Sequence, residues 1–194
     1  KSLTAQVKSG LFLAHVRAST GTATSRNNCH PFVHGVWSFM HNGQVGGYDS
    51  FRRDADMMVP DHLYPQRKGA TDSEALFLTA IAEGLDGDPR GALEGASARF
   101  IRLSREKGSL PHLRLTAALS NGRRLYAVRY ATDEAAPSLY YRWSDSRIGM
   151  AVVSEPLEAD EGGWTEVPTA SFCTFEGEAV KVEDFHPCRL AAAA

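Results

Sequence analysis

The strongest local signal in the sequence is a β-hairpin near the middle of the chain. Leu113–Ser120 and Arg123–Tyr130 are two β-forming runs that flank Asn121-Gly122. Asn-Gly is favoured in the tight turns that join antiparallel strands, because both residues tolerate a positive φ. This stretch therefore predicts an antiparallel sheet.

Two helices are predicted before the hairpin. The first begins at Thr71, which together with Glu74 forms a capping-box pattern, and it ends at Gly84 and Gly87. The second covers about 89–107, with apolar residues on one face and arginines on the other. Both helices therefore have an apolar face with which to cover a sheet.

Short apolar runs predict further strands, and the first two are expected as neighbours in one buried sheet. Residues 48–69 predict a short helix followed by an irregular loop. Strands, then two helices, then many strands are typical of a single α+β domain, here 1–194, in which helices cover a largely antiparallel sheet. The predicted strands are Leu11–Val16, Val36–Met40, Leu139–Trp143, Met150–Val153, Trp164–Val167, Ser171–Phe175 and Ala179–Phe185.

Composition excludes several classes of function. The chain has 194 residues, 43% of them hydrophobic, which is enough for one sizeable core. A net charge of -2 and a pI near 6.4 argue against nucleic acid or an anionic membrane as partner. No apolar run reaches the roughly 18 residues of a membrane span. Three widely spaced cysteines predict neither a disulfide framework nor a zinc site, and favour a cytoplasmic protein.

Polar residues gather where the first two predicted strands end, as expected of an active site on a rigid scaffold. Arg17 follows the first strand, where its guanidinium could bind a carboxylate in a bidentate manner or form an ion pair within the chain. Asn42-Gly43 follows the second strand, either as a tight turn or as hydrogen-bond donors to an oxyanion. Asp72 lies in the first turn of a helix, either complementing the helix dipole or binding an ammonium group.

Four histidines near these residues raise the alternative of a metal site. They are His15, His30, His34 and His41. His30 and His34 are four residues apart, but Pro31 follows His30 directly and no zinc protease helix is predicted there, so roles in the core or around a pocket are favoured.

The order of these motifs resembles that of the glutaminase domain of class II glutamine amidotransferases. The motifs are AHVRASTG, NCHPF, FMHNG and TDSEALF, and the later SEPL, Trp164 and Val167-Pro168 look like the same family's C-terminal signature. The resemblance spans about 11–168 and is greatest to the small stand-alone branch with relatives in glutathione breakdown and ergothioneine synthesis. It implies the four-layer αββα sandwich of the N-terminal-nucleophile hydrolases.

The resemblance also implies roles for individual residues. Arg17, with Thr20 assisting, would bind the α-carboxylate of glutamine, and Asp72 would bind its α-ammonium. Asn42 and the Gly43 N–H would form the oxyanion hole. The implied reaction is hydrolysis of a γ-glutamyl amide through a cysteine thioester, with no metal or organic cofactor. His30 would shape the pocket wall, and any ammonia released could pass to a synthetase partner.

The nucleophile of the family is a cysteine at the mature N-terminus, whose α-amine of pKa about 7.7–8.0 acts as the general base. This sequence begins at Lys1, and Cys29, Cys173 and Cys188 are all internal. We therefore expect the catalytic cysteine and the first strands to precede Lys1. Two alternatives stay open: a non-catalytic glutamine- or γ-glutamyl-binding subunit of a complex, and a metal-dependent hydrolase that uses the histidines.

Overall fold

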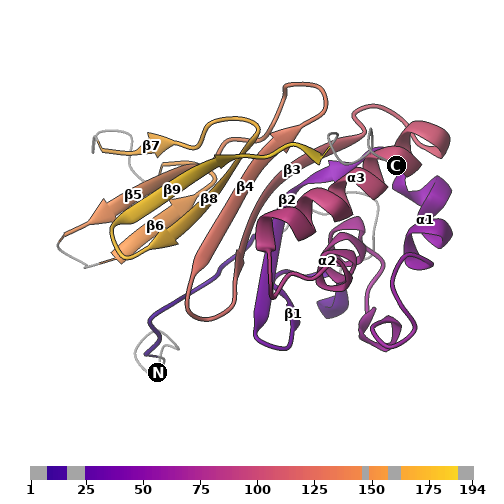
Figure 1. Cartoon of the computed structure of the whole chain (residues 1–194), viewed down its shortest axis with the longest axis horizontal. Helices are drawn as coiled ribbons and strands as arrows, with labels where there is room; N and C mark the ends of the chain where they lie inside the picture. Colours follow the sequence, from indigo (N-terminus) through magenta and orange to yellow (C-terminus); the bar gives the residue numbers. More distant parts are fainter. Residues whose placement is uncertain (1–7, 17–24, 146–148, 157–162, 188–194) are drawn as a thin grey trace.

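The computed structural model describes residues 8–16, 25–145, 149–156 and 163–187, and in them two antiparallel sheets and three α-helices (Figure 1). None of the described helices is long and apolar enough to cross a membrane. The elements are η2 (Arg26–Asn28), β1 (Phe32–His34), β2 (Trp37–Val45), α1 (Tyr48–Asp56), η3 (Tyr64–Gln66), α2 (Asp72–Ala82), α3 (Pro89–Lys107), β3 (Leu113–Ser120), β4 (Leu125–Ala131), β5 (Tyr140–Ser144), β6 (Gly149–Val153), β7 (Thr165–Glu166), β8 (Ser171–Glu176) and β9 (Ala179–Asp184).

The larger sheet has the strand order β1-β2-β3-β4-β8-β9, and the smaller one has the order β6-β5-β7. The predicted hairpin is confirmed, because β3 pairs with β4 from Ser120 opposite Leu125 onward, and Gly122 in the turn has a φ of 81°. Both predicted helices and the later strands are also present, with shifts of one or two residues at some ends.

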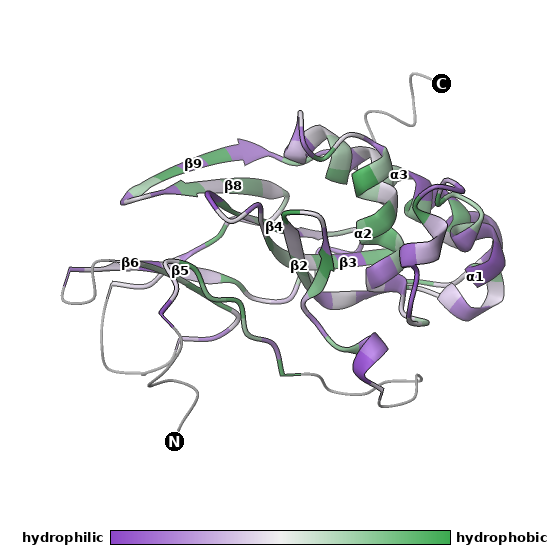
Figure 2. Cartoon of the chain, turned by 90° about the horizontal axis from the view of Figure 1, so that it is seen from below, coloured by the Kyte–Doolittle hydropathy of each residue, from purple (hydrophilic) through white to green (hydrophobic). Residues whose placement is uncertain are grey.

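The molecule is layered, with the helices on one face of the large sheet and the small sheet on the other (Figure 2). Side chains on β4 alternate accordingly. Tyr126 and Val128 pack in the core under the helices, whereas Ala127 packs with Leu139, the residue before β5 of the small sheet. The predicted α+β class is confirmed, and the described residues form three layers of the αββα sandwich.

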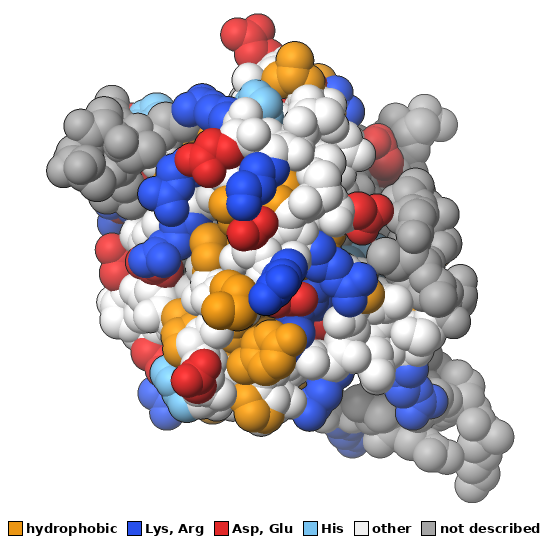
Figure 3. Space-filling view, turned by 90° about the vertical axis from the view of Figure 1, so that its right-hand side faces the viewer, with side chains coloured by type: hydrophobic (Ala, Val, Ile, Leu, Met, Phe, Trp, Pro, Cys, Tyr) orange, Lys and Arg blue, Asp and Glu red, His pale blue; other side chains and the backbone are white. Residues whose placement is uncertain are grey.

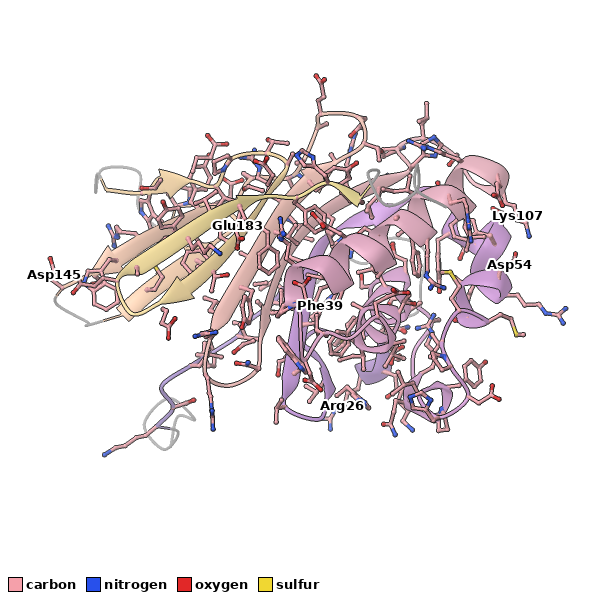
Figure 4. All side chains as sticks on the ribbon, in the orientation of Figure 1. Arg26, Phe39, Asp54, Lys107, Asp145 and Glu183 are labelled. Atoms are coloured by element: carbon pink, nitrogen blue, oxygen red, sulfur yellow. The ribbon has the colours of Figure 1, made fainter. Side chains whose placement is uncertain are left out.

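The core beneath the helices is aromatic. Phe39 of β2 stacks on Phe77 of α2 with ring centroids 5.3 Å apart, and neither side chain is accessible to solvent by more than 1% (Figure 4). Figure 3 shows basic and acidic side chains side by side on one face of the molecule. The ion pairs made by the helical segments include Arg99–Glu83 and Lys107–Asp54. The helical layer is thus apolar inside and polar outside, as its sequence pattern predicts.

The prediction of a buried strand at Leu11–Val16 is wrong. The segment pairs with none of the described strands, and Phe12 and Val16 are 80% and 97% exposed. A strand needs a neighbour to accept and donate its backbone hydrogen bonds, and apolar composition cannot provide one.

The prediction that the second strand ends at Met40 is also wrong. Strand β2 continues to Val45, since β3 pairs with it along this whole stretch, with Asn42 opposite Thr116 and Gly43 opposite Leu115. Asn42-Gly43 is therefore neither a strand end nor a hairpin turn. The pairing of Asn42-Gly43 with the distant strand β3 excludes the tight-turn alternative. Turn propensity depends on neighbouring residues only and cannot predict such pairing.

The N-terminus of α2 is held by a buried ion cluster centred on Arg67, whose side chain is 4% exposed. Its guanidinium contacts Asp56 at 2.9 Å and Glu74 at 2.6 Å, and it donates to the Tyr48 hydroxyl at 2.8 Å. Desolvation alone would lower the pKa of Arg67, but the contacts with Tyr48, Asp56 and Glu74 outweigh it and raise that pKa above its usual value.

The capping box at α2 has only one of its two arms. The Thr71 hydroxyl accepts from the Glu74 N–H at 3.2 Å, as predicted. The Glu74 carboxylate does not return to Thr71. It accepts instead from the backbone N–H groups of Lys68 and Gly69, at 2.9 and 2.8 Å, besides its contact with Arg67. Glu74 therefore fixes the loop before α2 rather than the cap itself.

Replacing Arg67 by Met should lower the free energy of unfolding by about 3–5 kcal/mol, because Glu74 and Asp56 would lose the cation that compensates their burial. Urea titration measures this change. The control is Arg124→Met, since the Arg124–Glu176 pair is 51% and 66% exposed. Its loss should leave the free energy of unfolding nearly unchanged, because solvent screens exposed ion pairs. Equal changes for the two variants would contradict a stabilising role for the buried cluster.

Candidate active site

A cavity of about 1330 Å³ lies between the β2–β3 part of the large sheet and β6 of the small sheet, beside the N-termini of α1 and α2. The segment Leu11–Val16 contributes to its wall. The lining is mixed, with apolar side chains from β6 and polar groups from β2 and α2. Among the lining residues are His30, Met40, Asn42, Gly43, Asp72 and Met150.

Asn42 faces this cavity because side chains alternate along β2. Phe39 and His41 turn toward the helices and are buried, whereas Met40 and Asn42 turn to the opposite face. Asn42 is exposed there. Its amide is thus available to a ligand in the cavity.

Gly43 adopts a φ of 151°, and a side chain at this position would collide with the chain around it. An added Cβ would lie 2.0 Å from the carbonyl oxygen of Arg114 and 2.7 Å from Nε2 of His41. Only glycine fits this close approach of β2 to its neighbours.

Asp72 is half-buried at the first position of α2. Its carboxylate accepts from the Ser73 N–H at 2.7 Å through Oδ1 and from the Val45 N–H at 2.8 Å through Oδ2. The second contact joins β2 to α2 directly. A carboxylate here complements the helix dipole, and the same side chain also lines the cavity, so the two sequence interpretations of Asp72 are compatible.

His30 lines the cavity from the loop before β1. Its ring lies against His15, with centroids 4.3 Å apart, and edge-on to Phe32 at 4.7 Å. These contacts make His30 part of an aromatic stretch of the cavity wall. No group of three or more His, Cys, Asp or Glu side chains placed to hold a metal occurs in the described part of the chain.

Four of the six predicted site residues therefore share one cavity: His30, Asn42, Gly43 and Asp72. Arg17 and Thr20 lie outside the described residues. The chemical roles of all six stay predictions. Sequence reasoning missed the contacts of Asp72 with Val45 and Ser73, because a backbone amide leaves no signature in the residue letters.

Neither described cysteine has the surroundings of a nucleophile in this cavity. Cys29 is exposed, donates to the Ser25 carbonyl at 3.3 Å and is not part of the cavity wall. Cys173 is fully buried between the two sheets, and burial raises the pKa of its thiol to about 11. Since the thiolate is the reactive form, Cys173 is suited to packing rather than to attack.

Solved structures with the same layered arrangement define the class of fold. The chain resembles a glutamine aminotransferase class-II domain protein from Silicibacter pomeroyi, with a TM-score of 0.81 and 56% identity over 84% of this chain and 73% of that one. It also resembles glutamine phosphoribosylpyrophosphate amidotransferase from B. subtilis, with a TM-score of 0.60 and 16% identity over 88% and 34% of the two chains. The fold is therefore that of class II glutamine amidotransferase domains.

The sequence comparison identifies the family. Residues 3–142 match the class II glutamine amidotransferases. The chain is 31% identical to the "probable glutamine amidotransferase DUG3" of Saccharomyces cerevisiae, over 92% of its own length and 60% of the length of the yeast protein. The chain belongs to the class II glutamine amidotransferase family. It spans less than two thirds of this yeast relative.

At pH 8, iodoacetamide should modify Cys29 well before Cys173, as read by site-resolved peptide mass spectrometry. The raised pKa of Cys173 leaves little thiolate at this pH, and burial also blocks access. Raising the pH toward 11 should increase the reaction at Cys173 only if the fold also opens. Faster labelling of Cys173 than of Cys29 in the native protein would contradict the structural role.

Proposed function

We propose that the intact protein hydrolyses a γ-glutamyl amide, either glutamine or a larger γ-glutamyl compound, to glutamate and ammonia or an amine. The observation that supports this most is the meeting of Asp72 with Asn42 and Gly43 in one cavity of a class II glutamine amidotransferase fold. A carboxylate for an ammonium group and donors for an oxyanion are the two features that such a substrate requires.

The amino-acid end of the substrate would be held by opposite charges. Asp72 binds the α-ammonium, and Arg17, assisted by Thr20, binds the α-carboxylate through its bidentate guanidinium. His30 closes the side of the pocket. Fixing the substrate at both charged groups places its γ-carbonyl in attack geometry, which can supply a large share of the rate enhancement.

The oxyanion would form next to β2. Gln44 and Gly46 face β3, as the hydrogen bond from the Gly46 N–H to the His112 carbonyl indicates, while the Val45 N–H points the other way to Asp72. The two-residue repeat of a strand would turn the Gly43 N–H to the same open edge as that of Val45. With the Asn42 amide, it provides two donors for the developing negative charge.

The reaction needs a cysteine other than Cys29 and Cys173, which we propose is the N-terminal residue of the mature protein. Its thiolate attacks the γ-carbonyl carbon, the proton passes through the α-amine to the leaving nitrogen, and the C–N bond breaks to give a thioester. Water then cleaves the thioester to glutamate and free thiol. No metal or organic cofactor takes part.

We also propose that released ammonia passes to a synthetase or amidase partner and that the protein is cytoplasmic. The alternative function is that of a non-catalytic subunit that binds glutamine or a γ-glutamyl compound within a complex. Both functions use the same binding groups, so only a test of the nucleophile separates them.

The first test is intact mass and N-terminal sequencing of the full-length protein, before and after treatment with diazo-oxo-norleucine. We expect one adduct on an N-terminal cysteine and loss of glutamine hydrolysis. Glutamine should protect against labelling because it occupies the same pocket. A full-length protein that binds glutamine but gains no adduct and releases no ammonia would be the binding subunit.

Replacing Asn42 by Ala should lower kcat by about 10²–10³ while KM stays near its original value, because an oxyanion donor acts in the transition state. Steady-state ammonia release measures both constants. Asn27→Ala is the matched control, since Asn27 is exposed and is not part of the cavity wall. A raised KM with unchanged kcat would mean that Asn42 binds the ground state instead.

A further inference from the structure

The least expected polar contacts near the cavity are those of His41 and Ser73, which are both buried, at 3% and 6% exposure. His41 Nδ1 lies 2.9 Å from Ser73 Oγ, and His41 Nε2 lies 3.0 Å from the carbonyl oxygen of Arg114. These contacts connect β3, β2 and α2 through side chains. The roles proposed above for the cavity residues do not account for them.

The donor in each of these linked hydrogen bonds can be assigned from the group that must accept. A carbonyl oxygen can only accept, so its contact with His41 assigns a proton to Nε2. The Ser73 hydroxyl has one proton, which it donates to the Asp72 carboxylate, so Ser73 Oγ accepts from His41 Nδ1. His41 therefore fixes the direction of the Ser73 side chain.

Ser73 in turn contacts Asp72. Its Oγ lies 3.2 Å from Asp72 Oδ1, the same oxygen that accepts from the Ser73 N–H at 2.7 Å. The other carboxylate oxygen is held by Val45. The orientation of the carboxylate is thus set from α2 on one side and from β2 on the other.

His41 also lies directly against Gly43. A Cβ at Gly43 would come within 2.7 Å of His41 Nε2, so the ring occupies the space beside the oxyanion strand. One buried imidazole therefore touches the strand of the oxyanion donors and, through Ser73, reaches the carboxylate of the ammonium site. A shift of the ring would disturb the distance between these two parts of the cavity.

We infer that His41 and Ser73 are positioning residues that hold Asp72 in the orientation for the α-ammonium of the substrate. The inference rests on the proposed function, in which Asp72 binds that group. In this account the substrate contacts Asp72, and His41 and Ser73, which are buried in the cavity wall, act through that carboxylate. Their effect should therefore appear only for substrates that have an α-ammonium.

The test compares two substrates of the full-length protein, glutamine and 4-carbamoylbutanoate, which lacks the α-amino group. The readout is kcat/KM for glutamine divided by kcat/KM for 4-carbamoylbutanoate. A general loss of active protein lowers both values equally and leaves this ratio unchanged. Ser73→Ala should raise KM for glutamine by about tenfold with kcat within about twofold, a size typical of one lost hydrogen bond to a charged group. The ratio should fall by the same factor.

Two variants serve as controls. Ser73→Thr keeps the hydroxyl and should restore the ratio. Ser97→Ala removes a fully buried hydroxyl from α3, away from the cavity, and should leave the ratio unchanged. His41→Phe keeps an aromatic ring but removes both nitrogens, and it should lower the ratio as Ser73→Ala does.

The variant Asp72→Asn distinguishes the positioning role of His41 and Ser73 from the ammonium-binding role of Asp72. If this variant lowers the ratio but Ser73→Ala and His41→Phe do not, the positioning role is wrong and the ammonium site stands. If Asp72→Asn itself leaves the ratio unchanged, the proposed ammonium contact is wrong and the positioning inference fails with it.

Discussion

The buried contact between Arg67 and Glu74 is the interaction on which the geometry of the cavity depends most. Glu74 accepts two backbone N–H groups from the loop before α2, and Arg67 joins it to Asp56 in α1. Burying these charges is costly unless every partner is present. Once all are present, the loop has few other arrangements, and the first residue of α2 is fixed relative to β2.

The same loop also fixes the segment that carries His30. The side-chain oxygen of Asn28, in η2, accepts from the Ala70 N–H at 2.8 Å. Gly69 allows this approach, since an added Cβ would lie 2.3 Å from the Asn27 carbonyl oxygen. Ion cluster, loop and η2 are therefore one connected unit that places His30 and Asp72 on the same wall. Charge burial far from solvent thus contributes to the shape of a polar site.

Much of the fold could be predicted from sequence because its signals are local. The turn at Asn121-Gly122, the cap at Thr71 and the apolar face of 89–107 each depend on residues near one another in the chain. The failures concern long-range partners. Leu11–Val16 has the composition of a strand without a neighbour, and Asn42-Gly43 has the composition of a turn but is paired with β3. The amino-acid sequence of a segment gives its propensity for a strand or a turn. Whether the segment pairs depends on which strand lies beside it in the fold.

For the candidate site, too, some features could be predicted from the sequence and others could not. The motif order pointed to His30, Asn42, Gly43 and Asp72, which do line one cavity. The contacts that orient Asp72 could not be predicted, because they come from the Val45 amide and from a serine whose partner is a histidine far away in sequence. Propensity and motif spacing describe which residues a site contains. Its orientation depends on hydrogen bonds that only the folded chain brings together.

The edge of the small sheet next to the cavity is apolar. Strand β6 pairs with β5 on one side, and its other side has no partner among the described strands. Exposed edges are usually protected by charged residues, but β6 has none, and Met150 and Val152 are only half-buried beside the cavity. An apolar, uncharged edge is suited to pairing with a further strand.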